Sequence, residues 1–473
     1  MEYLDDRLTL YGKTDYYPFH MPGHKRRELS FPNPYCIDIT EIDGFDNLHH
    51  AEGILREAQE RAAELYGSER CFYLINGSTC GILTAICAAT KKHDKVLVAR
   101  NSHKAVYHAA ELHELNVRYL YPVITETDLQ GQITPEQVKE AIQSEPDIRA
   151  VVITSPTYEG IISNIKGIIE VAHAYGIPVI VDEAHGAHLG FGGGFPENAI
   201  RQGADVVVMS LHKTLPSFTQ TALLHLNTGR VSEEEIARYL GIFETSSPSY
   251  LLMSGMDACV RMLQEDGEVL FQEYRKRLDS FYKDTADLKK LHVLSVSDFT
   301  EGEVFRWDDS KLVIFTGEAG MTGEELHRIL LDTYHLQMEM VSAFYVLGMT
   351  SIMDTEEGFV RLSAALHEID AGIRTADSNT SENFTRSMYV RNNSRMQIYQ
   401  AAEHPCREVG FEEAVGQVSA GYVYFYPPGI PVIVPGEIIT QELIGHIREY
   451  RDKNLCIEGI LNLSEERIKI VYF

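Results

Sequence analysis

Ser210-Leu-His-Lys213 places side chains capable of acid–base and nucleophilic chemistry directly after an apolar run. Residues 205–209 are rich in β-branched residues, follow Gly203 and are predicted to form a short buried strand. A lysine is rarely buried without a partner or a role, and open α/β sheets bind ligands at the carboxyl ends of their strands. We therefore predict that Lys213 is a reactive amine, and we favour a Schiff base with pyridoxal phosphate (PLP).

A second strand end carries acidic and imidazole side chains. Residues 179–182 form an apolar run that ends in Asp182 and Glu183, and His185 and His188 follow. A metal site is an alternative interpretation, although its ligands are expected to converge from several elements. A carboxylate facing a pyridine nitrogen keeps that nitrogen protonated, so that the ring accepts electrons. We favour this role for Asp182 and predict no bound metal.

A third motif is suited to a phosphate group. Tyr73-Leu-Ile-Asn-Gly-Ser-Thr-Cys-Gly81 is predicted to be a strand, then a small polar loop, then a helix. The N–H groups of a helix N-terminus bind anions, Gly77 permits close approach of the backbone, and Ser78 and Thr79 add hydroxyl groups. An ordinary helix cap is the alternative interpretation. The loop contains no lysine, so it does not fit a P-loop for nucleotides.

Asn101-Ser-His-Lys104 is similar to the later lysine motif and also follows a predicted strand. Its lysine, however, precedes the acidic strand. We favour Lys213 over Lys104 as the reactive amine, and His103 as a flat ring that stacks on a cofactor.

His20 and His24 have the spacing of a helical pair of metal ligands, but Pro22-Gly23 between them breaks a helix. We interpret this stretch as a loop that faces substrate or another subunit, with a plain N-terminal turn as the alternative. The glycine-rich residues 190–194 lack the strand-to-helix context of a dinucleotide-binding fingerprint, so a flexible loop is expected there.

These motifs require a scaffold of alternating strands and helices. Residues 52–66 have apolar side chains at helical spacing, and Gly67 ends that helix. Strands are predicted at 71–75, 95–99, 150–154, 179–182 and 205–209, with helices such as 81–90 and 135–143 between them, a charged helical stretch at 257–288, and a smaller α/β portion with a strand at 311–315 and a helix at 322–333. The alternation predicts an α/β fold with a mainly parallel sheet covered by helices on both faces.

The composition narrows the class of protein. The chain has 473 residues, 44% of them hydrophobic, and a formal net charge of -27, which opposes binding to nucleic acid or anionic membranes and fits a cationic substrate. The seven cysteines form no CxxC pair and are expected to be reduced. We expect no signal peptide and no membrane span, and therefore a cytoplasmic protein.

The order of the motifs resembles that of the Orn/Lys/Arg decarboxylases. The motifs that carry the resemblance are His20-Met-Pro-Gly-His-Lys25, Asn76-Gly-Ser-Thr79, Asn101-Ser-His-Lys104, Ser155-Pro-Thr-Tyr158, Asp182-Glu-Ala-His-Gly-Ala-His188, Ser210-Leu-His-Lys213 and Tyr426-Pro-Pro-Gly-Ile-Pro431. The resemblance covers nearly the whole chain and implies PLP fold type I, the aspartate-aminotransferase fold, in a short form without an N-terminal wing domain. It also implies five segments: an N-terminal arm (1–50), a large PLP-binding domain (51–290), a small α/β domain (291–376), a linker (377–400) and a C-terminal decarboxylase domain (401–473).

The resemblance implies a role for each candidate site residue. Lys213 would bind PLP covalently, Asp182 would pair with the pyridinium nitrogen, and His103 would stack on the ring. The residues expected beside the cofactor, its phosphate and the lysine are Gly77, Ser78, Thr79, His185, Ser210 and His212. Thr245 and Ser246 would be donated across a homodimer interface. Lys213 or His212 would return a proton to the substrate after CO2 leaves.

The resemblance further implies decarboxylation of a basic amino acid, with L-arginine to agmatine and CO2, for polyamine biosynthesis, as the favoured reaction. Lysine or ornithine is the alternative substrate, and an aminotransferase or aldolase of the same fold is a further alternative. A PLP-binding protein without catalysis is disfavoured, because lysine, aspartate and phosphate loop are all present. Gly421 stands where the family pattern would place a glutamate, which leaves the recognition of the substrate's distal cation open. Glu437 is one candidate for it.

Overall fold

The computed structural model describes residues 3–27, 29, 31–317, 319–373, 391–425, 429–452, 456–460 and 466–473. Its largest sheet has seven strands in the order β2-β9-β8-β7-β5-β3-β4. The strands are β2 (Arg70–Leu74), β3 (Lys95–Ala99), β4 (Asn116–Leu120), β5 (Ile148–Thr154), β7 (Val179–Asp182), β8 (Val206–Ser210) and β9 (Ala222–Leu226). The five strands from β8 to β4 are parallel, and β9 is antiparallel to both β8 and β2. The predicted mainly parallel sheet is confirmed.

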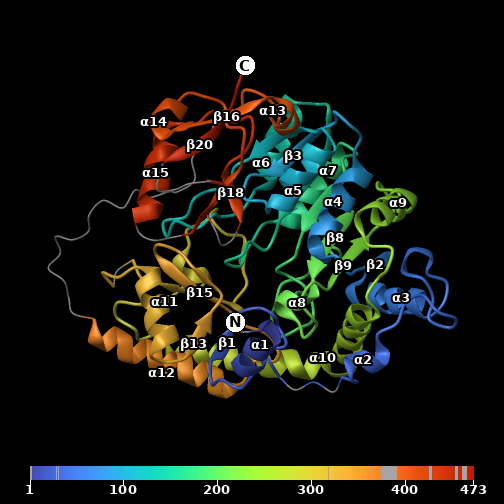
Figure 1. Cartoon of the computed structure of the whole chain (residues 1–473). Helices are drawn as coiled ribbons and strands as arrows, with labels where there is room; N and C mark the ends of the chain where they lie inside the picture. Colours follow the sequence, from blue (N-terminus) through green and yellow to red (C-terminus); the bar gives the residue numbers. More distant parts are fainter. Residues whose placement is uncertain are drawn as a thin grey trace.

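Helices cover both faces of this sheet (Figure 1). Strand β8 shows why its residues are all apolar: Val206 and Val208 pack into one core cluster, and Val207 and Met209 pack into the other. The helices on the first face are α4 (Gly77–Ala89), α5 (Lys104–Leu112) and α9 (Glu233–Phe243). The helices on the second face are α3 (Ile54–Tyr66), α6 (Pro135–Ser144), α7 (Ile165–Ala174) and α10 (Tyr250–Asp284).

Several predicted boundaries agree with the structure, others shift by one or two residues, and two helix starts differ by four residues or more. The strands expected at 95–99, 179–182 and 311–315 have those bounds, and α3 ends at Gly67, whose φ of 82° suits glycine. Helix α4 begins four residues before the predicted start, because the small polar residues that we took for a loop form its first turn. Helix α10 begins at Tyr250, where the Ser249 side chain accepts a hydrogen bond from the Leu252 N–H and caps the helix.

A smaller α/β part follows α10. Its sheet has the order β10-β12-β15-β14. Its main elements are β10 (His292–Val293), β12 (Lys311–Phe315), α11 (Gly323–Asp332), β14 (Met340–Val341), β15 (Tyr345–Met349) and α12 (Glu356–Gly372). The N-terminal arm is less irregular than expected, because it forms α1 (Leu4–Gly12), and its β1 (Tyr17–Phe19) pairs in parallel with β13 (Leu336–Met338) of this part.

The C-terminal part has a core of its own. Its elements are α13 (Ile398–Glu403), β16 (Cys406–Gly410), α14 (Phe411–Ala414), β17 (Val423–Phe425), β18 (Ile430–Ile433), α15 (Gln441–Asp452), β19 (Ile457–Glu458) and β20 (Arg467–Val471). Figure 1 shows this part, in red, at the end of the molecule that carries α5, and the smaller α/β part, in yellow and orange, at the other end. Most of the predicted linker lies outside the described residues, and the division into five segments stays a prediction.

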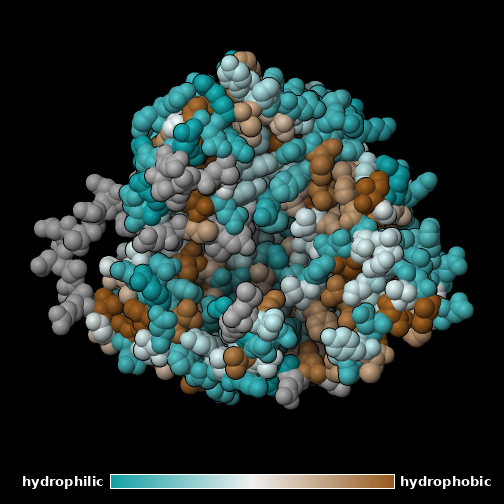
Figure 2. Space-filling view, viewed as in Figure 1, coloured by the Kyte–Doolittle hydropathy of each residue, from teal (hydrophilic) through white to brown (hydrophobic). Residues whose placement is uncertain are grey.

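The short helix α8 (Leu211–Thr214) follows β8 and lies between these parts. Figure 1 shows it near the middle of the molecule, and Figure 2 shows that the same face is hollowed near its centre. The N-terminal arm contacts α8 directly, because the Gly23 N–H donates to the His212 carbonyl at 2.7 Å. The smaller part holds the other side of Gly23, since the Ser351 hydroxyl donates to its carbonyl at 2.6 Å.

Gly23→Ala is expected to destabilise this junction. An added Cβ would lie 2.6 Å from the backbone N and O of Leu215, which is too close for any van der Waals contact. We expect the free energy of unfolding to fall by about 1–3 kcal/mol, as in other overpacked sites, and urea denaturation measures it. Gly12→Ala in the same arm is the control, because nothing lies within 4 Å of its added Cβ. Equal denaturation midpoints for the two variants would contradict the close contact.

Candidate active site

Lys213 lies on α8, one turn after the end of β8. Its Nζ is 2.9 Å from Nε2 of His185, which follows β7. Burial lowers the pKa of Lys213, while the negative charges of Asp182 and Glu339 raise it. A lowered pKa makes the neutral amine available, and the neutral amine is the nucleophilic form of lysine.

Asp182 ends β7, the strand next to β8, and it is paired in register with Val208. Its side chain is buried, with 4% of its surface exposed, and its Oδ1 accepts a hydrogen bond from the Ala184 N–H at 3.2 Å. Burial raises the pKa of this carboxyl group, whereas the charge of Lys213 lowers it. Asp182 therefore carries a carboxylate that a cationic ring nitrogen would stabilise.

His103 lies at the same edge of the sheet, in the turn between β3 and α5. It is the N-cap of α5, where its side chain accepts a hydrogen bond from the Ala105 N–H. Burial and the positive charges of Lys213 and Lys104 lower the pKa of His103 to about 3. Its imidazole is therefore neutral at physiological pH, as a ring that stacks on an aromatic cofactor should be.

The sequence predicts an anion site at the first turn of α4, and this turn has the open geometry that such a site needs. Gly77 has φ +77°, and the side chain of the N-cap residue Asn76 makes no capping hydrogen bond. Ser78 is partly exposed and Thr79 is exposed, so the first-turn N–H and hydroxyl groups are accessible to a phosphate.

The Ser210 hydroxyl gives an independent test of whether the residues fit PLP. It is fully buried at the end of β8 and has no hydrogen-bond partner in the described protein. A buried hydroxyl without a partner is costly, and a phosphate oxygen would satisfy it. Together with the buried amine, the buried carboxylate, the neutral ring and the helix N-terminus, this hydroxyl makes a donor set that fits PLP.

A hydrogen bond to the backbone fixes the orientation of the His212 ring. Its Nδ1–H donates to the Thr221 carbonyl at 3.0 Å, and burial lowers its pKa to about 4. In the neutral ring the other nitrogen, Nε2, is then a hydrogen-bond acceptor. His212 directly precedes Lys213 in the sequence.

Thr245 and Ser246 lie on the surface of the single chain. Both are exposed, directly after Glu244, which accepts a hydrogen bond from Ile75 N–H beside the α4 turn. The Thr245 carbonyl accepts a hydrogen bond from His49. Their expected role across a subunit interface stays a prediction.

Glu437, a candidate receptor for the substrate's distal cation, already has polar partners within the protein. It is fully buried in the C-terminal part and accepts hydrogen bonds from Arg100 and Asn392, both at 3.2 Å. A carboxylate already paired with a buried guanidinium is a poor receptor for a substrate cation. Gly421 is partly exposed, and a Cβ added to it would lie 4.0 Å from the Cβ of Lys469.

Two further polar residues, to which the sequence assigned no role, reach the site. The Tyr158 ring lies 4.4 Å from the His185 ring between centroids, and its hydroxyl donates to Glu339. The other oxygen of Glu339 accepts the Met21 N–H at 2.7 Å. Tyr158 lies in one of the family motifs, whereas Glu339 could be found only from the tertiary structure.

The histidines weighed as metal ligands have other contacts. His188 is buried and lies 3.1 Å from Asp308, and His20 contacts Tyr11 through Nε2. Among the residues that the structure describes, no group of three or more His, Cys, Asp or Glu side chains is arranged to hold a metal ion. Within the same residues, no helix has the length and apolar character needed to cross a membrane.

A lysine beyond a central strand, an aspartate on the neighbouring strand and an anion-binding helix N-terminus define the PLP-dependent enzymes of fold type I. The family model described as Orn/Lys/Arg decarboxylase, major domain, matches residues 4–306, and that of the Orn/Lys/Arg decarboxylase C-terminal domain matches residues 378–454. The chain belongs to the Orn/Lys/Arg decarboxylase family and is a decarboxylase, as predicted.

The relatives span nearly the whole chain. The arginine decarboxylase of Halalkalibacterium halodurans is 32% identical and that of Bacillus subtilis 30% identical, and each match covers 96% of this chain and 94% of the relative. Among solved structures, lysine decarboxylase A from Pseudomonas aeruginosa superimposes with a TM-score of 0.76 over 99% of this chain and 82% of that one, at 18% identity. These comparisons confirm the predicted fold class and imply PLP as the cofactor.

The low pKa of His103 predicts a pH dependence of stability. An unfolded histidine binds a proton near its ordinary pKa of about 6.5, whereas the folded ring stays neutral down to about 3, so acidification favours the unfolded state. His103 should reduce the free energy of unfolding by about 1–2 kcal/mol between pH 7 and pH 5.

His103→Gln should therefore lose less stability than the wild type on acidification, as measured by urea denaturation at each pH. His50→Gln is the control, because His50 is exposed. An identical pH dependence for His103→Gln and the wild type would show that the ring titrates normally.

Proposed function

We propose that this decarboxylase acts with PLP on L-arginine and releases agmatine and CO2, which supply polyamine biosynthesis. The observation that carries the proposal is the contact between Lys213 and His185 beside the buried Asp182. The arginine decarboxylases that align over nearly the full length support the choice of substrate. The net charge of -27 is suited to a cationic amino acid.

Each part of the site has a distinct task in this proposal. When bound, PLP supplies an aldehyde carbon for an amino group and a ring that accepts the electrons of the breaking Cα–carboxylate bond. Asp182 would hold the ring nitrogen protonated, His103 would stack on the ring, and the first turn of α4 with Ser210 would bind the phosphate.

The remaining residues move protons and hold the amine. Lys213, with its lowered pKa, would hold the aldehyde carbon of PLP through its neutral amine, and the same amine, once released and protonated, could return a proton to Cα after CO2 has left. His185 hydrogen-bonds the amine, and Tyr158 packs against His185 and keeps its ring in place. His212, as a neutral ring whose N–H donates to the Thr221 carbonyl, can accept a proton but has none free to donate, so Lys213 is the proposed donor.

We also propose a cytoplasmic homodimer with its active sites at the subunit interface. The exposed Thr245 and Ser246 support the interface, because their side chains are accessible to another chain. The seven cysteines are all unpaired, which supports a reducing compartment.

The substrate cation needs a carboxylate, and we propose Glu339 for that role. Among the described acids, Asp182 and Glu339 are those whose charges raise the pKa of Lys213. Asp182 is buried, whereas Glu339 is partly exposed. A guanidinium or ammonium group entering beside Lys213 would therefore meet the carboxylate of Glu339.

A direct assay tests the reaction. The purified protein with PLP should show the visible absorbance of lysine-bound cofactor and release CO2 from arginine faster than from lysine or ornithine. Asp182→Ala should lower kcat by about 10²-fold or more, the cost typical of removing a preorganised charge. Asp266→Ala, on the exposed side of α10, is the control. Near-normal turnover by Asp182→Ala would overturn the assignment of Asp182 as the partner of the ring nitrogen. Faster release of CO2 from lysine than from arginine would overturn the choice of arginine as substrate.

Glu339→Gln tests the recognition of the cation. A hydrogen bond between charged groups contributes about 1.5–3 kcal/mol, so KM for arginine should rise about tenfold or more with a smaller change in kcat. Tyr158→Phe is the matched variant, since it removes the hydroxyl that donates to Glu339 and keeps the carboxylate. An unchanged KM in Glu339→Gln would refute the role.

A further inference from the structure

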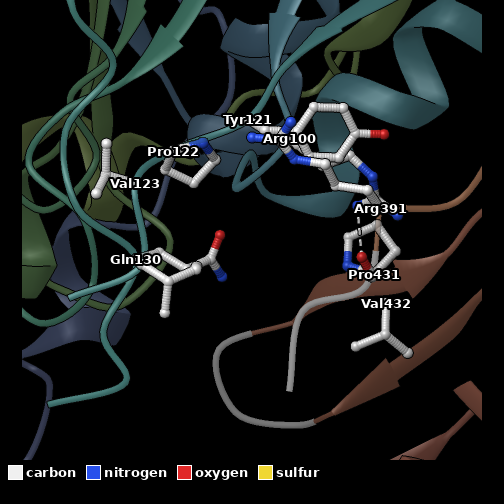
Figure 3. A pocket seen from close by; sticks show the side chains of 9 residues that line it. Arg100, Tyr121, Pro122, Val123, Gln130, Arg391, Pro431 and Val432 are labelled. Atoms are coloured by element: carbon white, nitrogen blue, oxygen red, sulfur yellow. Dashed lines mark hydrogen bonds between the residues drawn. The ribbon is translucent and has the colours of Figure 1, made fainter. Parts of the chain in front are cut away.

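A cavity of about 310 Å³ lies where the C-terminal part meets the large sheet. One wall follows β4 and includes Pro122 and Val123, and the opposite wall consists of Pro431 and Val432 of β18 (Figure 3). Ile124 also lines the cavity. Both walls are apolar, and the cavity shares no lining residue with the cluster around Lys213. It is large enough for a small organic molecule.

The polar lining of the cavity includes buried nitrogen donors. Arg100 and Gln130 are buried, with 7% and 5% of their surfaces exposed. Nε of Arg100 and Nε2 of Gln130 have no hydrogen-bond acceptor in the described protein, and Figure 3 shows the Gln130 amide directed into the space between the two walls. Buried donors without acceptors are rare and costly, which indicates that a ligand supplies the acceptor.

The charges around the cavity favour an anion. The guanidinium of Arg100 is held in place by the Pro431 carbonyl and by Glu437. Arg391 adds a second guanidinium, whose carbon lies 5.0 Å from the centroid of the Tyr121 ring. Two guanidinium groups, of the buried Arg100 and the exposed Arg391, line the cavity, and among the described residues only that of Arg100 is paired with a carboxylate, so the local charge is positive and a cationic amino acid such as the substrate is repelled.

We propose that this cavity binds a small organic carboxylate, a molecule distinct from the substrate. The carboxylate would accept hydrogen bonds from Arg391, Gln130 and Nε of Arg100, and the apolar body would lie between the walls at Pro122 and Val432. Guanidinium groups match the planar geometry of a carboxylate. The apolar walls disfavour inorganic phosphate, which would lose hydration without compensating donors on those sides.

The position of the cavity connects it to the active site. Arg100 follows the last residue of β3, and His103, the proposed stacking ring, lies three residues further along the same turn. The carboxylate therefore binds to the segment that orients His103, and to the C-terminal part at the same time.

Isothermal titration of the PLP-loaded enzyme with 3-phenylpropionate tests the proposal. We expect one saturable site with Kd below about 1 mM, and no saturable binding of the neutral 3-phenylpropionamide or of inorganic phosphate. Arg391→Gln and Gln130→Glu should each weaken binding tenfold or more, the first by removing a charge and the second by placing a carboxylate of the same size against the ligand.

Arg395→Gln is the matched control, because Arg395 is an exposed arginine on the same segment that stacks on Phe473, outside the cavity. Circular dichroism and CO2 release without ligand verify that each variant is folded and loaded with PLP. The proposal is overturned by an absence of saturable binding to the wild type, by equal binding of the amide or of phosphate, or by binding that Arg391→Gln and Gln130→Glu leave unchanged.

Discussion

The burial of Lys213 between acidic and basic neighbours is the constraint on which the rest of the site depends. Removal from water favours its neutral amine, and the carboxylates of Asp182 and Glu339 oppose that effect. These opposing effects on the pKa of Lys213 arise because three separate elements, β7, α8 and the segment before β14, meet around its amine. Because the amine must be both buried and reachable, it lies beyond the end of a strand and outside the sheet's own core.

Buried ion pairs around the site hold those elements together. Lys25 donates to the carbonyls of Pro18, His20 and Met349 and lies 3.8 Å from Asp354, which ties the N-terminal arm to the smaller α/β part. Such pairs lose hydration when they are buried, so they contribute little to stability and mainly fix how the arm and the smaller part are positioned.

A second buried lysine supports the histidine beside Lys213. Lys311 is fully buried, pairs with Asp308 at 2.8 Å and donates to the His185 carbonyl at 3.3 Å. The same aspartate contacts His188 at 3.1 Å, and its pKa is lowered by these positive neighbours against the effect of burial. The loop that carries His185 is therefore bound from the smaller part, so that a movement of that part would reach the catalytic amine.

The sequence by itself determined the elements whose signals are local. The apolar runs of β7 and β8, the lysine and aspartate at their ends and the helix after β2, although not its first turn, each follow from the order of neighbouring residues, because strand burial and helical periodicity depend on short-range patterns. Only the tertiary structure decided which distant side chains meet: Glu339 reaches the site through a hydrogen bond to Met21, and Glu437 is paired with Arg100. Such contacts join residues more than 300 positions apart. They cannot be predicted from the sequence, because the packing of the parts, and not any local pattern, decides which buried charges are paired.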